Sequence, residues 1–172
     1  MRTLVIDSAT EACSVALFDD AGLIAGELRI MGRGHAEALV PMIAALPEKG
    51  RAERIVVSLG PGSFTGVRVG LAAAKALALA WQAQALGYPT LALIAVQAQA
   101  EAGNQALSVC MTGGHGEWFV QDFAADGAPA SPLASLRPDL AASTLHHPLI
   151  AGSQAEALVA LRGHGTGLAL LP

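Results

Sequence analysis

The residues from Ser58 to Gly70, SLGPGSFTGVRVG, constrain the fold of this chain more than any other stretch. They join an apolar run, Ile55–Val57, which is typical of a buried strand, to an Ala- and Leu-rich run, Val67–Ala83, which predicts a long helix. Glycine tolerates positive φ angles and close approach to the backbone, whereas Pro61 fixes one φ angle. The pattern therefore predicts a strand, a glycine-rich turn and a helix of an α/β fold, with Thr65 as the N-cap.

The same pattern has a second interpretation, because a helix N-terminus after a glycine turn is a common anion site. However, the spacing fits neither the G-x-x-x-x-G-K-[ST] nor the G-x-G-x-x-G phosphate motif, and no lysine follows in the first helical turn. A phosphate loop and a structural turn that sets the angle of the helix both stay open.

Three segments have a recognisable sequence pattern: GPGSFTGVRVG at 60–70, LVIDSATEACSVAL at 4–17 and GHAEALVP at 34–41. They resemble the TsaB (YeaZ) family, bacterial proteins needed to make threonylcarbamoyladenosine in tRNA. The similarity is close over roughly residues 1–100 and looser beyond. It implies an α/β fold of the actin-like ATPase type (ASKHA, RNase H-like), with two lobes of mixed sheet and flanking helices.

We expect a first lobe at residues 1–103, containing the GPGSFTG loop, and a second lobe at residues 104–172. Apolar periodicity predicts strands at Thr3–Asp7, Cys13–Phe18, Leu23–Met31, Arg54–Leu59, Ala106–Met111, Glu117–Phe123 and Leu149–Ala151, and helices at His35–Leu46, Val67–Ala83, Leu91–Ala102 and Gln154–Leu161. Residues 126–138, rich in Ala, Pro and Ser, are typical of a loop. Family members continue beyond the segment that matches Gly165–Pro172, so we expect a second lobe that is shortened relative to the family.

The first predicted hairpin reads Asp7-Ser8-Ala9-Thr10. In the actin-like ATPases that this chain resembles, the equivalent hairpin binds phosphate through a D-x-G-[TS] pattern. Ala9 replaces the glycine that lets the backbone curl around a phosphate. Two interpretations remain: Asp7, Ser8 and Thr10 contact a nucleotide, or Asp7 caps the hairpin by accepting backbone hydrogen bonds.

A metal site is not expected. The catalytic TsaD-like relatives have a His-x-x-x-His pair, whose two imidazoles share one helix face and bind a metal. In this chain His35 is followed four residues later by Leu39. One histidine and a leucine cannot form that site, so we interpret His35 as a histidine at a helix N-terminus or at an interface.

The long predicted helix is nearly free of charge, with only Arg68 and Lys75 between Val67 and Trp81. A helix that is apolar nearly all round needs cover on more than one side. Small residues recur every four positions along it, which permits close helix packing. Together with the first helix it predicts a two-helix surface that binds a partner or, when alone, a second copy. The predicted contact residues are His35, Leu39, Met42, Ile43, Gly70, Leu71, Ala74 and Leu77. The residues of the signature loop are Gly60, Pro61, Gly62, Ser63, Phe64, Thr65, Gly66 and Arg68.

Composition narrows the function classes. The net charge is −4 and only 4% of the 172 residues are aromatic, which argues against a domain that binds nucleic acid without a partner. The two cysteines, Cys13 and Cys110, lie in separate apolar runs without metal spacing and are expected as buried thiols. No signal-peptide pattern opens the sequence, and its longest run of low charge is interrupted by polar and breaker residues. A cytoplasmic location without a membrane span is expected.

The resemblance implies a non-catalytic subunit that stabilises and activates a TsaD-like threonylcarbamoyl transferase, in a complex that a TsaE-like ATPase joins. In such a complex tRNA would be bound mainly by the other chains, and ATP or ADP has a place at the interface between subunits. The alternative is a stand-alone enzyme of actin-like fold, either a metal-dependent glycoprotease-like peptidase or a phosphotransferase. That alternative requires a ligand pair or an open phosphate hairpin, and Leu39 and Ala9 occupy those positions.

Overall fold

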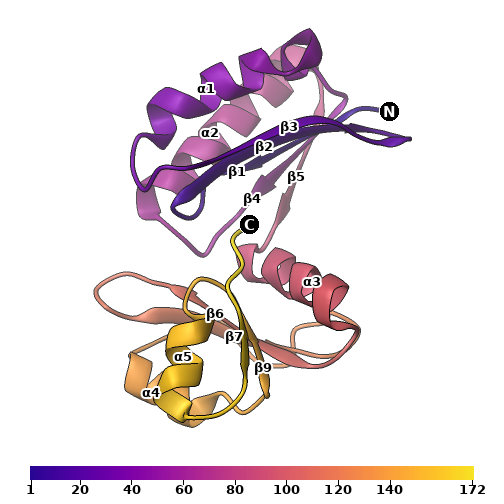
Figure 1. Ribbon diagram of the computed structural model, residues 1–172. Helices are drawn as coiled ribbons and strands as arrows, with labels where there is room; N and C mark the ends of the chain where they lie inside the picture. Colours follow the sequence, from indigo (N-terminus) through magenta and orange to yellow (C-terminus); the bar gives the residue numbers. More distant parts are fainter. The chain divides into compact units, whose positions relative to one another are not determined.

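The computed structural model describes all residues, Met1–Pro172, and forms two compact units, Met1–Pro89 and Thr90–Leu171 (Figure 1). Each unit is built on a five-stranded mixed sheet with helices packed against it, which confirms the predicted fold class. The boundary lies at Pro89 and not at residue 103. Helix α3, Thr90–Ala102, belongs to the second unit because Leu91, Ile94 and Ala95 pack into the core of that unit.

The sheet of unit 1 has the strand order β3-β2-β1-β4-β5. Its strands are β1 (Thr3–Asp7), β2 (Ala12–Asp19), β3 (Gly22–Ile30), β4 (Arg54–Ser58) and β5 (Gln84–Tyr88). β1, β2 and β3 form an antiparallel meander, while β4 pairs parallel to β1 and β5 parallel to β4. β3 is therefore one edge of the sheet and β5 is the other.

Both long helices of unit 1, α1 (His35–Ala45) and α2 (Phe64–Trp81), pack on one face of this sheet (Figure 1). Alternate residues of the strands, such as Leu4, Val15 and Ile55, point to this face and are buried. They form a single apolar core with Leu39 and Met42 of α1. A short 3₁₀ turn, Pro47–Gly50, leads from α1 towards β4.

The sheet of unit 2 has the order β10-β9-β6-β7-β8 and has helices on both faces. Its strands are β6 (Leu107–Thr112), β7 (Trp118–Phe123), β8 (Ala134–Leu136), β9 (Leu149–Ala151) and β10 (Thr166–Leu168). Helix α3 covers one face, and α4 (Pro138–Thr144) and α5 (Ala155–Arg162) cover the other. Val109 and Cys110 are neighbours in β6 and face the two different cores.

The elements that the sequence failed to predict are short or lack a periodic signal. The sequence predicts no element at β5, α4 or β10, and β8 lies in the segment 126–138 that it predicts as a loop. β5 forms because it completes the parallel ladder with β4, not because its residues favour strand. Helix α2 begins earlier than predicted, and its N-cap is Ser63, whose Oγ accepts a hydrogen bond from the Gly66 N–H at 3.2 Å; the predicted cap, Thr65, lies inside the helix.

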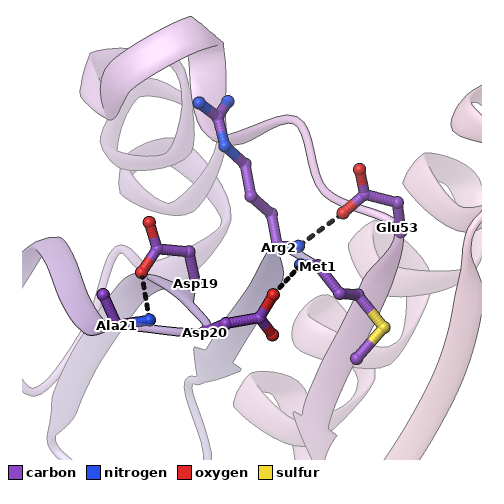
Figure 2. A network of polar contacts seen from close by, with 6 residues as sticks. All are labelled: Met1, Arg2, Asp19, Asp20, Ala21 and Glu53. Atoms are coloured by element: carbon purple, nitrogen blue, oxygen red, sulfur yellow. Dashed lines mark hydrogen bonds and ion pairs between the residues drawn. The ribbon is translucent and has the colours of Figure 1, made fainter.

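A polar network ties the start of the chain to the β2–β3 turn (Figure 2). The amino group of Met1 donates to Asp20 at 2.6 Å, and the Arg2 N–H donates to the Glu53 carboxylate. In the turn itself the Ala21 N–H donates to Asp19 at 2.8 Å. These groups are largely exposed, so we expect the network to fix the position of the turn more than to stabilise the fold.

Candidate functional site

The signature loop packs onto the first hairpin of unit 1. The Ser63 N–H donates to the carbonyl of Ala9 at 2.6 Å, and the Ser8 hydroxyl donates to the carbonyl of Gly66 at 2.8 Å. These two bonds run in opposite directions across the same contact. The loop between β4 and α2 is therefore fastened to the turn between β1 and β2, a contact that we call the clasp.

Three glycines make the clasp sterically feasible. A Cβ atom on Gly62 would overlap the Ala9 carbonyl, and one on Gly66 would overlap the Ser8 carbonyl. On Gly70 it would lie 2.6 Å from the Ser8 Oγ. The glycines of the signature are thus required by the approach of one backbone to another, which supports the structural-turn interpretation over the phosphate loop.

Asp7 is the last residue of β1, directly before Ser8 and Ala9 of the clasp, and is buried. Its carboxylate accepts the Ala9 N–H at 2.8 Å and the Tyr88 hydroxyl, from β5, at 2.6 Å. Burial raises the pKa of Asp7, although the hydrogen bonds from Tyr88 and Ala9 act in the opposite direction. Burial and the neighbouring Asp7 charge also raise the pKa of Tyr88, so its hydroxyl stays a donor. Asp7 therefore caps the hairpin, as one of the two sequence-based interpretations expected.

The three candidate nucleotide contacts are all used within the fold. Asp7, Ser8 and Thr10 are buried, and Thr10 Oγ1 accepts the Ala12 N–H at 3.2 Å. The Ala9 N–H and carbonyl are both engaged, so the hairpin does not fit a phosphate unless the signature loop moves away. Sequence reasoning could not detect this closure because Tyr88 and Ser63 are distant in the chain.

The structure also places His35 inside the fold. Its ring packs in the buried region beneath α1, with Nε2 3.3 Å from the carbonyl of Ala12. Within residues 1–172 no group of three or more His, Cys, Asp or Glu side chains is arranged to hold a metal ion. A hollow of about 430 Å³ lies beside His35, where α1 and α2 begin, and Arg33, Glu37 and Thr65 line it.

Most of the predicted partner-contact residues face the core of their own unit. Buried among them are His35, Leu39, Met42, Ile43, Gly70 and Ala74, while Leu71 and Leu77 are half-buried. The prediction took the stripe of small residues on α2 as a surface for another helix. In the structure this stripe packs on β1 and β4, because only small residues allow the clasp to close. From these positions the six buried residues present little surface to a partner.

The outer side of α2 is the surface that remains, and we define it by Phe64, Arg68 and Leu79. Leu79 is 83% exposed and Phe64 is 73% exposed, and the Arg68 guanidinium stacks 3.4 Å from the centre of the Phe64 ring. Val40 on α1 is also exposed. By length and composition α2 is the single helix here that could cross a membrane, a property that helices in the cores of folded proteins share. Phe64 and Arg68 belong to the signature loop that the sequence identifies, whereas Leu79 is not among the contact residues that the sequence predicts.

Comparisons with known proteins agree with this fold and signature. A family model described as "TsaD: tRNA N6-adenosine threonylcarbamoyltransferase" matches residues 29–160. The tRNA threonylcarbamoyladenosine biosynthesis protein TsaB of Escherichia coli is 35% identical over 131 residues, which is 73% of this chain and 56% of that protein. The chain belongs to the TsaB (YeaZ) family.

Solved structures of this family superimpose closely. A protein from Pseudomonas aeruginosa with similarity to peptidase YeaZ has a TM-score of 0.82 and 28% identity, over 99% of this chain and 85% of that one. The ethanolamine utilization protein EutJ from Carboxydothermus hydrogenoformans has a TM-score of 0.56 at 12% identity, over 100% of this chain and 86% of that one, and supports the fold alone. The chain spans about half the length or less of the curated TsaB relatives that it matches.

Proposed function

We propose that this chain is a non-catalytic subunit in the synthesis of N6-threonylcarbamoyladenosine in tRNA, and that it stabilises and activates a TsaD-like catalytic subunit. The observation that carries the proposal is helix α2. It has 18 residues and is nearly free of charge. Leu71, Leu77 and Trp81 pack partly against its own core, but only Gly66, Gly70 and Ala74 are fully buried there. Such a helix is costly to leave in water and suits an obligate partner.

The closed hairpin supports the non-catalytic part of the proposal. Ser8 is bonded in the clasp, and Asp7 and Thr10 accept hydrogen bonds within the hairpin, so a phosphate would have to compete with hydrogen bonds inside the fold. We therefore assign ATP or ADP to the assembled complex and not to this hairpin. With a net charge of −4 the chain contributes little attraction for tRNA, which the catalytic subunit would hold.

The outer side of α2 is the contact we propose for the catalytic subunit. Phe64 and Leu79 offer apolar anchors, and Arg68, held over the Phe64 ring and bonded to its carbonyl at 3.1 Å, offers a positioned cation. Aromatic and arginine side chains supply most of the binding energy in many interfaces. A TsaE-like ATPase would join the complex formed in this way.

Reconstitution tests the proposal. Purified TsaD-like subunit, TsaE-like ATPase, tRNA and threonylcarbamoyl-adenylate are combined with or without this chain, and the modified nucleoside is measured by mass spectrometry. We expect the chain to raise the rate and the Leu79→Glu variant to lose most of that effect. Leu161→Glu, which alters an exposed leucine on α5 of the other unit, is the matched control and should act as wild type.

Two results would overturn the proposal. One is that the chain fails to stimulate the reaction although it is folded. The other is that the chain alone hydrolyses peptides or transfers phosphate, which would revive the enzyme alternative. Assays of the purified chain with and without divalent metal distinguish that alternative, because a glycoprotease-like activity needs a metal and a phosphotransferase needs a nucleotide.

A further inference from the structure

The face of the unit 1 sheet opposite α1 and α2 carries no helix of its own unit. Ile55 and Val57 of β4 point into the core beneath the helices, so Arg54 and Val56 alternate to the opposite face. We call this second surface the open face. The strand register places an uncharged row across its centre, one residue from each strand: Gly26, Ala16, Val5, Val56 and Leu86.

The row is hollowed where its residues are small. Gly26 and Ala16 lie opposite each other on β3 and β2, while the next residues on the same face, Leu28 and Phe18, are large. A hollow of about 340 Å³ lies between them, and these four residues are part of its lining. Leu28 is 55% exposed. The open face therefore has both apolar surface and a place for an apolar side chain.

Unit 2 shows what covers such a face. Strands β6 to β10 pair in the same order and the same directions as β1 to β5, so the two sheets have one topology. In unit 2, α4 and α5 take the places of α1 and α2, and α3 covers the opposite face (Figure 1). A single helix of 13 residues thus closes in unit 2 the face that stays open in unit 1.

Helix α3 also shows which pattern such a helix needs. One side of it is an apolar stripe buried against the strands, formed by Leu91, Ile94, Ala95 and Ala98. Glu101 follows on the same side, three residues after Ala98, and is exposed. A helix of this length spans about 20 Å, and five strands span about 19 Å. An apolar stripe with a carboxylate at one end therefore matches the dimensions of the open face.

Arg54 makes a carboxylate the charge that the open face requires. Its side chain is half-buried, its Nε is buried without a hydrogen-bond partner, and it forms no ion pair. The other charged residue on β1 and β4 is Asp7, which already accepts hydrogen bonds from Ala9 and Tyr88. Burial of an unpaired guanidinium group is unfavourable, and a carboxylate from outside would satisfy it.

We propose that the open face binds an amphipathic helix of another protein, one with an apolar stripe like that of α3 and a carboxylate that pairs with Arg54. The stripe packs along the central row, and one of its larger side chains fills the hollow beside Gly26. Arg54 and Val56 are about 7 Å apart along β4, so one helix reaches both. This site is independent of the proposed function, which uses the outer side of α2.

A peptide with the α3 sequence provides the probe. The peptide Thr90–Ala102, with blocked ends and a fluorescent label, is titrated with the full chain, and fluorescence anisotropy measures binding. We expect saturable binding, and Arg54→Glu should raise the dissociation constant at least about tenfold. A peptide with Glu101→Arg should lose as much affinity for wild type. Combining this peptide with Arg54→Glu exchanges the two charges and should restore binding.

Matched controls separate the site from general effects of charge. Arg51→Glu alters an exposed arginine of the same unit that lies beside Trp81 of α2, and it should bind the peptide as wild type does. Leu28→Glu places a charge beside the hollow and should weaken binding at least about tenfold, whereas Leu161→Glu in unit 2 should not. Circular dichroism melts verify that all variants fold.

Two outcomes would overturn the inference. One is that the folded chain shows no saturable binding of the peptide. The other is binding that Arg54→Glu and Leu28→Glu leave unchanged, which would place the peptide on a different surface, including the face of unit 2 that α3 occupies. Leu79→Glu should not alter peptide binding, so this experiment and the reconstitution assay can fail separately.

Discussion

The two units use similar five-stranded sheets and bury them differently. In unit 2 helices cover both faces, with α3 on one and α4 and α5 on the other, and each face has its own apolar core. In unit 1 both helices lie on the same face and form one core. Within that unit the opposite face carries Leu23, Leu28 and Ile30, and the outer side of α2 carries Leu79, all of them exposed.

The difference indicates where the molecule is available to other proteins. A sheet with two covered faces is a completed fold, whereas a sheet with one covered face still has apolar surface to bury. Unit 1 also contains the signature loop, whose glycines serve internal packing. The signature loop of unit 1 therefore secures inner contacts, and the outer surfaces of the unit are the ones we propose for partners.

Among the substitutions considered, one in the clasp should lower the free energy of unfolding the most. Gly66→Ala would place a Cβ atom on the Ser8 carbonyl, and neither backbone can move without releasing α2 from the sheet. We expect a loss of at least about 3 kcal/mol in the free energy of unfolding, or failure to fold. The matched control is Gly114→Ala, since Gly114 has open space around it, and it should change stability by less than about 1 kcal/mol. Chemical denaturation measures both.

Truncation of apolar residues tests whether the two sheets differ as described. In unit 1, Leu17→Ala removes a fully buried side chain and should cost about 2–5 kcal/mol, while Leu28→Ala on the open face should cost less than about 1 kcal/mol. In unit 2, Val109→Ala and Val120→Ala lie on opposite faces, and both should cost about 1–3 kcal/mol. Equal losses of unfolding free energy for Leu17→Ala and Leu28→Ala would contradict the difference between the covered and the open face of the unit 1 sheet.

The buried Asp7–Tyr88 contact predicts a pH dependence that belongs to unit 1. Because burial raises the pKa of Asp7 in the folded state, its contribution to stability is complete below the unfolded pKa and is lost as the pH rises through the folded pKa. The Asp7→Asn variant cannot titrate, so its stability relative to wild type should improve from about pH 4 towards neutrality. Denaturation curves at several pH values measure this.

Tyr88→Phe sharpens the same test. Without the hydroxyl the carboxylate loses a hydrogen bond that lowers its pKa, so the dependence on pH should become steeper. The variant should also lose about 1–3 kcal/mol at neutral pH, because a buried acceptor is left with one partner fewer. A pH profile identical to that of wild type would show that Asp7 and Tyr88 are not coupled.

The smallest expected change in stability comes from substitutions at the N-cap of α2. Ser63→Ala removes the acceptor for the Gly66 N–H and should lower stability by about 1 kcal/mol. Thr65→Ala, at the position that the sequence pattern favoured, should have almost no effect because Thr65 is exposed within the first turn. The reverse order of the two losses would restore the original assignment of the cap.

The sequence predicted the strands and helices with strong periodicity, and the glycine-rich turn after a buried strand was sufficient to predict the α/β unit around it. It could not predict β5, β8 and β10, since short strands depend on the ladder they join more than on their own residues.

The candidate site was harder to predict for a similar reason. The spacing of Gly66, Gly70 and Ala74 identifies a smooth side of α2, but spacing alone does not say whether a sheet or a partner lies against it. The choice depends on Ser8 and Ala9, far away in the chain, whose carbonyls lie where side chains on Gly66 and Gly62 would be. Once that side is known to face inwards, Leu79 follows as the exposed position on the opposite side.

The central claim is that the TsaD-like subunit binds unit 1 at the outer side of α2. A calorimetric titration of that subunit with this chain tests the claim most directly. We predict that wild type and Leu161→Glu bind equally, and that Leu79→Glu binds at least about tenfold more weakly, because it would bury an unpaired charge at the contact. Equal affinity of Leu79→Glu and wild type, or no binding by wild type, would contradict the account.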